Sequence, residues 1–96
     1  MTNEEFRLLI ESLAGQWPQS RTDPTGTVAV LVSETIKYRD KLNEEAGIVL
    51  TVEDTRIALE ALEARLNGQP PPHKLTSEQE GLAQIYYDRL TLFGRR

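Results

Sequence analysis

Three threonines, each followed three residues later by an acidic or amide side chain, mark helix starts along this chain. They form the motifs Thr2-x-x-Glu5, Thr51-x-x-Asp54 and Thr76-x-x-Gln79. In such a capping box the threonine oxygen accepts from the backbone N–H three residues on, and the second side chain reaches back to the threonine N–H. Glycines follow at positions typical of a left-handed residue after a helix. These glycines are Gly15, Gly47, Gly68 and Gly94. The pattern predicts several helices with defined ends.

The spacing of apolar residues between these boundaries predicts four helices in one domain. We expect helices over residues 3–14, 27–46, 52–66 and 77–93, joined by loops at 15–26 and 68–75. Each helix carries apolar residues three and four apart on one side, as a helix packed against a core does. The expected fold class is therefore all-α, a small four-helix bundle-like single domain spanning 1–96.

The segment from 27 to 52 also fits a second interpretation. Residues 27–32 are rich in β-branched side chains, and 48–52 form another short apolar run. With a helix from Ser33 to Ala46 between them, they would make a β-α-β unit and an α+β fold. A two-stranded parallel sheet would leave unpaired edges. We therefore favour one long helix and keep the β-α-β unit as the alternative.

The apolar stripes define the expected core. The first helix places Phe6, Leu9, Ile10 and Leu13 on one side, with Leu8 off that stripe. The second places Val28, Leu31, Val32, Thr35, Ile36, Arg39 and Leu42 on one side. The third has Val52, Ala58, Leu59, Leu62 and Leu66, and the last has Leu82, Ile85, Tyr86, Leu90 and Phe93. Gly81 inside the last helix is expected to weaken it by about 1 kcal/mol relative to alanine.

Composition excludes most chemistry. The 96 residues include no cysteine and one histidine. Thiol catalysis, disulfides, zinc ribbons and multi-histidine metal sites within one chain are therefore excluded. His73 lies in the proline-rich loop with no nucleophile marked near it, and the chain has no glycine-rich phosphate loop. We expect no catalytic residue, no cofactor, no metal and no enzymatic activity.

Charge and hydropathy argue against two further kinds of partner. The net charge is −4, and nearby acids dilute the basic residues Lys37, Arg39 and Lys41, which argues against a dedicated nucleic-acid binder. The longest apolar run, residues 28–32, is far shorter than the roughly 20 residues of a membrane span. The chain also begins without a basic and apolar leader. We expect a cytoplasmic protein that does not contact a membrane.

Apolar and aromatic side chains slightly exceed what four core stripes need, which is typical of a surface that meets another molecule. The surplus includes Leu8 and Leu92. The candidate partner-binding residues are Trp17, Ile57, Ala61, Ala64, Tyr87, Arg89 and Phe93. Arg89 fits two roles, pairing with an acid of a neighbouring helix or contacting a partner. The predicted function is a non-catalytic protein-interaction or regulatory module, such as an inhibitor or adaptor, that binds a protein partner or itself.

One short segment resembles a known family. Residues 48–59 resemble the second loop and third helix of histone-fold proteins, in which a short extended segment precedes Thr-x-x-Asp and an Ala-Leu pair. Thr51, Asp54, Ala58 and Leu59 carry the match, whereas Thr55 stands where that family usually has an apolar residue. The alternative function is therefore a small helical protein associated with nucleic acid, either histone-fold-like or helix-turn-helix-like. No functional residue is carried over from the resemblance.

Overall fold

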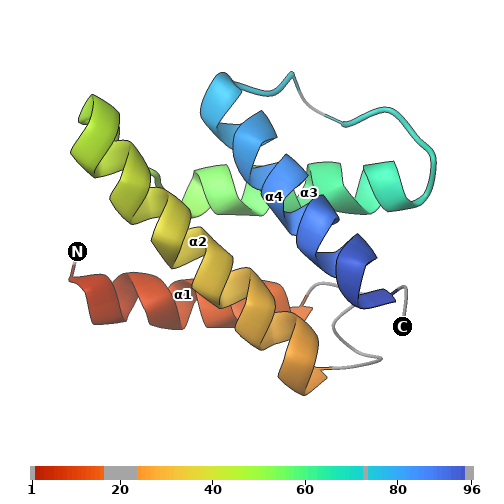
Figure 1. Cartoon of the computed structure of the whole chain (residues 1–96), viewed down its shortest axis with the longest axis horizontal. Coiled ribbons are helices and arrows are strands. Elements are labelled where there is room, and N and C mark those ends of the chain that lie inside the picture. The colour runs from red at the N-terminus through yellow and green to blue at the C-terminus, as the bar shows by residue number, and fades with distance from the viewer. Residues whose placement is uncertain (1, 17–23, 73, 95–96) are drawn as a thin grey trace.

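The computed structural model describes residues 2–16, 24–72 and 74–94, and all regular structure in these ranges is helical (Figure 1). The helices are α1 (Asn3–Gln16), α2 (Pro24–Ala46), α3 (Val52–Leu66) and α4 (Ser77–Gly94). The predicted all-α fold class is confirmed. The β-α-β alternative is wrong, because 27–32 lie inside α2 and 48–51 form an irregular connection to α3.

Three helix boundaries differ from those predicted. The helix α1 continues through Gly15 to Gln16, and α4 includes Gly94, so neither glycine lies beyond its helix as predicted. The helix α2 begins at Pro24, three residues earlier than expected, and the fixed φ of proline suits the first turn of a helix. Gly47 and Gly68 behave as predicted, with φ of 67° and 71° directly after α2 and close after α3.

All three predicted capping boxes form. The backbone N–H groups of Glu5, Asp54 and Gln79 donate to the hydroxyls of Thr2, Thr51 and Thr76 at 3.1, 3.1 and 3.2 Å, respectively. In return, the three second side chains accept from the threonine N–H groups at 3.3, 3.0 and 3.1 Å. These bonds satisfy backbone donors that have no partner inside the helix, so each box fixes where its helix begins.

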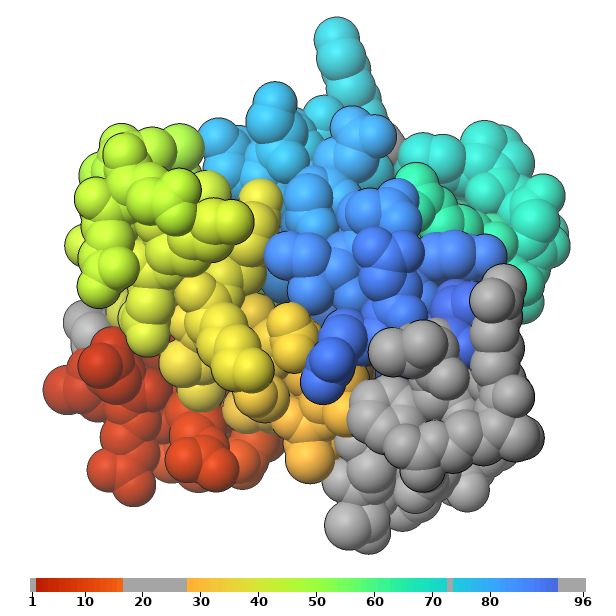
Figure 2. Space-filling view, viewed as in Figure 1, coloured from red at the N-terminus to blue at the C-terminus, as the bar shows by residue number. Residues whose placement is uncertain are grey.

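The helices pack as two pairs. The helix α1 packs against α2, and α3 packs against α4. In Figure 1, α2 crosses over α1 and α4 crosses over α3, while α1 and α3 form the layer behind. Figure 2 shows side chains of α2 and α4 meeting along the middle of the front face. The contacts between α2 and α4 and between α1 and α3 join the two pairs into one body.

The core consists of two adjoining clusters. The larger joins α3 and α4 to α2 and includes Leu31, Leu50, Leu59, Leu62, Leu82 and Tyr86. The smaller contains Phe6, Ile10 and Val32, between α1 and α2. Leu13 and Val28 pack against both clusters, so apolar contact is continuous from one helix pair to the other.

Two leucines assigned to core stripes are partly exposed instead. Leu9 is 44% exposed, and α1 buries Ala14, together with Phe6 and Ile10. Residues four apart advance by about 40° around a helix, so this buried stripe winds away from Leu9. Leu66, at the end of α3, is 37% exposed. The sequence pattern located the buried side of each helix but not its edges.

Gly81 allows α2 and α4 to approach closely. A Cβ atom placed at Gly81 would lie 3.2 Å from Cζ of Tyr38 and closer still to its hydroxyl oxygen. The sequence predicts only a cost in helix stability for this glycine, whereas the structure shows that the missing side chain makes room for Tyr38. Burial, with a smaller contribution from Glu78, raises the pKa of Tyr38.

A single hydrogen bond joins the capping boxes of α3 and α4. Gln79 Nε2 donates to Asp54 Oδ1 at 2.8 Å, while Asp54 Oδ2 accepts from the Thr51 N–H. Burial alone would raise the pKa of Asp54. Hydrogen bonds from the Thr51 backbone, Gln79 and the Thr51 side chain outweigh that effect and hold the pKa below its usual 3.8. The carboxylate form therefore stabilises the starts of both helices.

This arrangement predicts an acid-dependent loss of stability. Because the pKa of Asp54 is lower in the folded chain, its contribution is complete above the unfolded value of about 3.9 and is lost as pH falls through the folded pKa. We expect Asp54→Asn to flatten the fall in unfolding free energy below about pH 4. Urea titrations at several pH values measure this. The control is Asp40→Asn, which removes an exposed carboxylate from the middle of α2; an equal flattening in that variant would contradict the assignment.

Candidate interaction face between α1 and α2

The structure distributes the sequence-predicted site residues over different parts of the fold. Ala61 and Ala64 are buried in α3, and Ala61 belongs to the larger core cluster. Ile57 and Tyr87 are half-buried. Trp17 lies outside the described residues, as does the side chain of Phe93. The described members of this set therefore do not gather on one exposed surface.

Tyr87 and Arg89 each have a partner within the chain. The Arg65 guanidinium carbon lies 5.4 Å from the centre of the Tyr87 ring, in cation–π geometry. Arg89 Nε lies 3.3 Å from a carboxylate oxygen of Glu34 on α2. Of the two roles expected for Arg89, the structure shows the pairing with an acid of a neighbouring helix. Contact of Tyr87 or Arg89 with another molecule stays a prediction.

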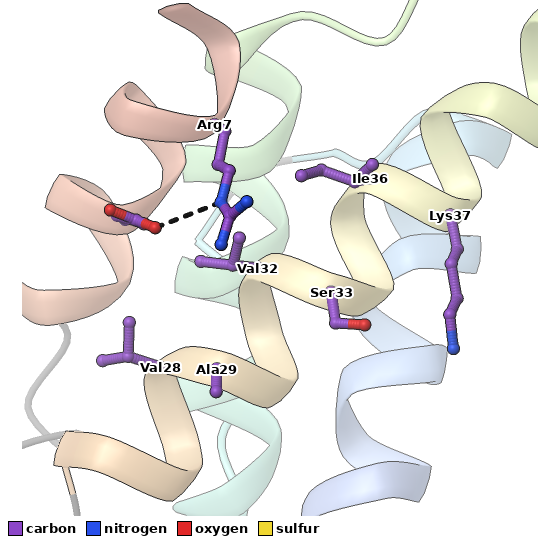
Figure 3. A pocket seen from close by; sticks show the side chains of 8 residues that line it. Arg7, Val28, Ala29, Val32, Ser33, Ile36 and Lys37 are labelled. Carbon is purple, nitrogen blue, oxygen red and sulfur yellow. Dashed lines mark hydrogen bonds and ion pairs between the residues drawn. The ribbon is translucent and has the colours of Figure 1, made fainter. Parts of the chain in front are cut away.

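A hollow lies elsewhere, between α1 and α2. It has a volume of about 530 Å³ and is open to solvent. Its lining residues are Arg7 and Glu11 of α1 and Val28, Ala29, Val32, Ser33, Ile36 and Lys37 of α2. Figure 3 shows Arg7 projecting from α1 toward Val32. Residues 28, 32 and 36 are four apart, so their side chains form an apolar floor over successive turns of α2.

A second hollow of about 450 Å³ adjoins the first. It shares Arg7, Glu11 and Ile36 with the first hollow and is also lined by Leu8. Leu8 is 59% exposed, which leaves a large apolar side chain in water beside the hollow. We call the surface made by Arg7, Leu8, Glu11, Val28, Val32 and Ile36 the α1–α2 face.

An ion pair lines both hollows of this face. Arg7 Nε lies 3.3 Å from Glu11 Oε1, one turn further along α1, and the two side chains are 62% and 42% exposed. Exposed ion pairs of this kind contribute little to stability. The two charges can therefore exchange partners at small cost when another molecule approaches.

The charges around the face are mixed in sign. Lys37 Nζ lies 3.9 Å from a Glu34 carboxylate oxygen, so part of its field is neutralised. Arg39, the central member of the basic triplet in α2, lies 4.3 Å from the centre of the Phe6 ring and donates to Asn3 Oδ1 at 2.7 Å. These contacts hold Arg39 against α1. Arg39 and Lys37 therefore do not form one continuous basic surface.

Neither a metal site nor a membrane-spanning helix is found in the part of the chain that the structure describes. There, no group of three or more histidine, cysteine, aspartate or glutamate residues could hold a metal ion. None of the described helices is both long enough and apolar enough to cross a bilayer. Several acids instead have basic partners, and Arg56 contacts both Glu53 and Glu60 within α3.

Sequence reasoning identified only part of the α1–α2 face. In the sequence, Leu8 is a leucine that lies off the predicted apolar stripe of α1. Val28, Val32 and Ile36 belong to the predicted core stripe of α2, and the structure confirms that they pack with the smaller core cluster, where Val32 is buried. They also line the larger hollow, which apolar spacing alone does not show. The five consecutive apolar residues 28–32 cover more of the helix circumference than one buried stripe does. This excess is the sequence signal for an apolar surface on α2 outside the core stripe.

Comparisons with protein-family models, curated proteins and solved structures find no match to this chain. The likeness of residues 48–59 to histone-fold proteins therefore remains a likeness of local sequence. Function has to be argued from the geometry of the described residues.

Proposed function

We propose that this chain is a non-catalytic protein-binding module and that the α1–α2 face is its contact surface. The observation that carries the proposal is the exposure of Leu8 beside a hollow with a floor of Val28, Val32 and Ile36. An apolar side chain projecting next to an apolar hollow is the kind of surface that loses contact with water when a partner binds.

The layout of the face fits a protein partner. It combines aliphatic side chains with the charged residues Arg7 and Glu11, which line both hollows, and Lys37 also lines the larger hollow. Protein interfaces commonly bury apolar side chains together with polar ones, and arginine is enriched in them. We extend the proposal to a regulatory role in the cytoplasm, in which the module acts as an inhibitor or adaptor by occupying another surface.

The change Leu8→Asp tests the proposal directly. It places a charge at the exposed apolar side chain of the face without touching the core, so we expect loss of bound protein with little change in folding. Tagged wild-type and variant chains are compared in pull-downs from an extract of the organism that encodes the chain. Circular dichroism and thermal melts confirm that the variant is folded.

Val49→Asp is the matched control. Val49 is 65% exposed in the connection between α2 and α3 and lines neither hollow of the α1–α2 face. A protein retained by wild type and by Val49→Asp but lost with Leu8→Asp supports the proposal. Equal retention by all three chains would place binding on another surface. DNA binding at low salt that falls steeply as salt rises would favour the nucleic-acid alternative.

A further inference from the structure

We infer that the occupant of the α1–α2 face is a second copy of this chain, related to the first by a two-fold axis. The inference rests on the proposed function, because it names the partner of the same surface. A two-fold interface uses one patch twice, so the patch must be complementary to itself. The α1–α2 face meets that requirement in shape and in charge.

The shape of the face is complementary to itself because Leu8 lies beside the larger hollow and not in it. Leu8 lines the smaller hollow but not the larger one, and the residues common to both are Arg7, Glu11 and Ile36. Leu8 and the floor residues Val28 and Val32 therefore line different hollows, whereas the Arg7–Glu11 ion pair lines both. A two-fold axis through that pair brings Leu8 of each copy over the hollow of the other.

The charges of the same ion pair are also complementary to themselves under a two-fold axis. Arg7 and Glu11 line both hollows and lie 3.3 Å apart on one helix, whereas Lys37 and Glu4 each line only one of the hollows. A two-fold axis between Arg7 and Glu11 sets Arg7 of each copy opposite Glu11 of the other, so two crossed ion pairs replace the two internal ones. Neither Arg7 nor Glu11 then faces a like charge at these two positions, and the arginine fork suits direct hydrogen bonding to a carboxylate.

Exchange of the two charges provides a sharp experiment. Arg7→Glu sets two acids against two acids across the axis, and Glu11→Arg sets two bases against two bases. When the two variants are mixed, every position 7 again faces an opposite charge at position 11 of the other copy. Each single variant should be monomeric, and the equimolar mixture should form a heterodimer.

Sedimentation equilibrium from about 10 µM to 1 mM reads out these masses, a range that covers a weak small interface. We expect wild type to dimerise in a concentration-dependent way and Leu8→Asp to weaken the dimer by about 100-fold or more, because both copies lose an apolar anchor. Val49→Asp should dimerise as wild type does, and circular dichroism checks folding of every variant.

Three results would overturn the inference. They are a wild type that stays monomeric at all concentrations, a dimer insensitive to Leu8→Asp, and a mixture of charge variants that associates no better than either alone. A monomeric wild type that still retains another protein through Leu8 would overturn the second-copy partner and leave the proposed function standing. A wild type that neither self-associates nor retains another protein would overturn both proposals.

Discussion

Replacing Leu62 with alanine is expected to lower the free energy of unfolding by about 2–5 kcal/mol, the range for leucine-to-alanine changes in packed cores. Leu62 is fully buried in α3 and belongs to the larger core cluster. The change removes buried methyl groups and leaves a cavity between helices that are each marginal on their own. Since small domains have only about 5–15 kcal/mol of net stability, much of the folded population is at risk.

Urea denaturation monitored by circular dichroism measures this effect, and Leu66→Ala is the control on the same helix. Leu66 lies one turn further along α3 and is 37% exposed, so the identical chemical change removes fewer buried contacts there. We expect a markedly smaller loss for Leu66→Ala. Equal losses at the two positions, or an unchanged midpoint for Leu62→Ala, would contradict the position of Leu62 in the core.

The second large effect is expected at the buried hydrogen bond between α2 and α4. Thr35 and Tyr86 are both fully buried, and their hydroxyl oxygens are within hydrogen-bonding distance of each other. The Thr35 hydroxyl donates its one hydrogen to the Leu31 carbonyl oxygen at 2.6 Å, so the Tyr86 hydroxyl must be the donor in the pair. Burial raises the pKa of Tyr86 above its usual value; the Thr35 bond lowers it, and Glu34 adds to the rise.

Thr35→Val should therefore cost about 1–3 kcal/mol, because it leaves the Tyr86 hydroxyl buried without its acceptor. In Tyr86→Phe the Thr35 hydroxyl keeps its bond to Leu31, so that variant should lose less. The double variant Thr35→Val with Tyr86→Phe should lie within about 1 kcal/mol of wild type, since both polar groups are gone. A double-mutant cycle from urea denaturation measures the coupling. Losses that simply add would show that the two hydroxyls do not interact.

Helix boundaries were the most predictable part of this fold. The three capping boxes form between residues three apart, so the sequence contains both partners of each bond. The contact between Gln79 and Asp54, which are 25 residues apart, had no such signal. The sequence likewise leaves two roles open for Arg89, because it does not show that Glu34 of α2 lies next to this arginine.

The candidate interaction face was less predictable than the fold. Apolar periodicity identified the side of α1 that faces inward, but it placed Leu9 in the core and could not tell that Leu8 stands beside a hollow. Which face of α2 is covered depends on the crossing of α1, and crossing is decided by side-chain packing across the whole contact.

What the sequence determined by itself is the set of helices and the starts of α1, α3 and α4, because caps and helical periodicity are interactions within a few residues. Only the tertiary structure decided which apolar residues remain exposed, why Gly81 is needed beside Tyr38, and where Arg7, Leu8 and Ile36 come together. These outcomes depend on how helices far apart in the chain press against one another, and no local pattern records that contact.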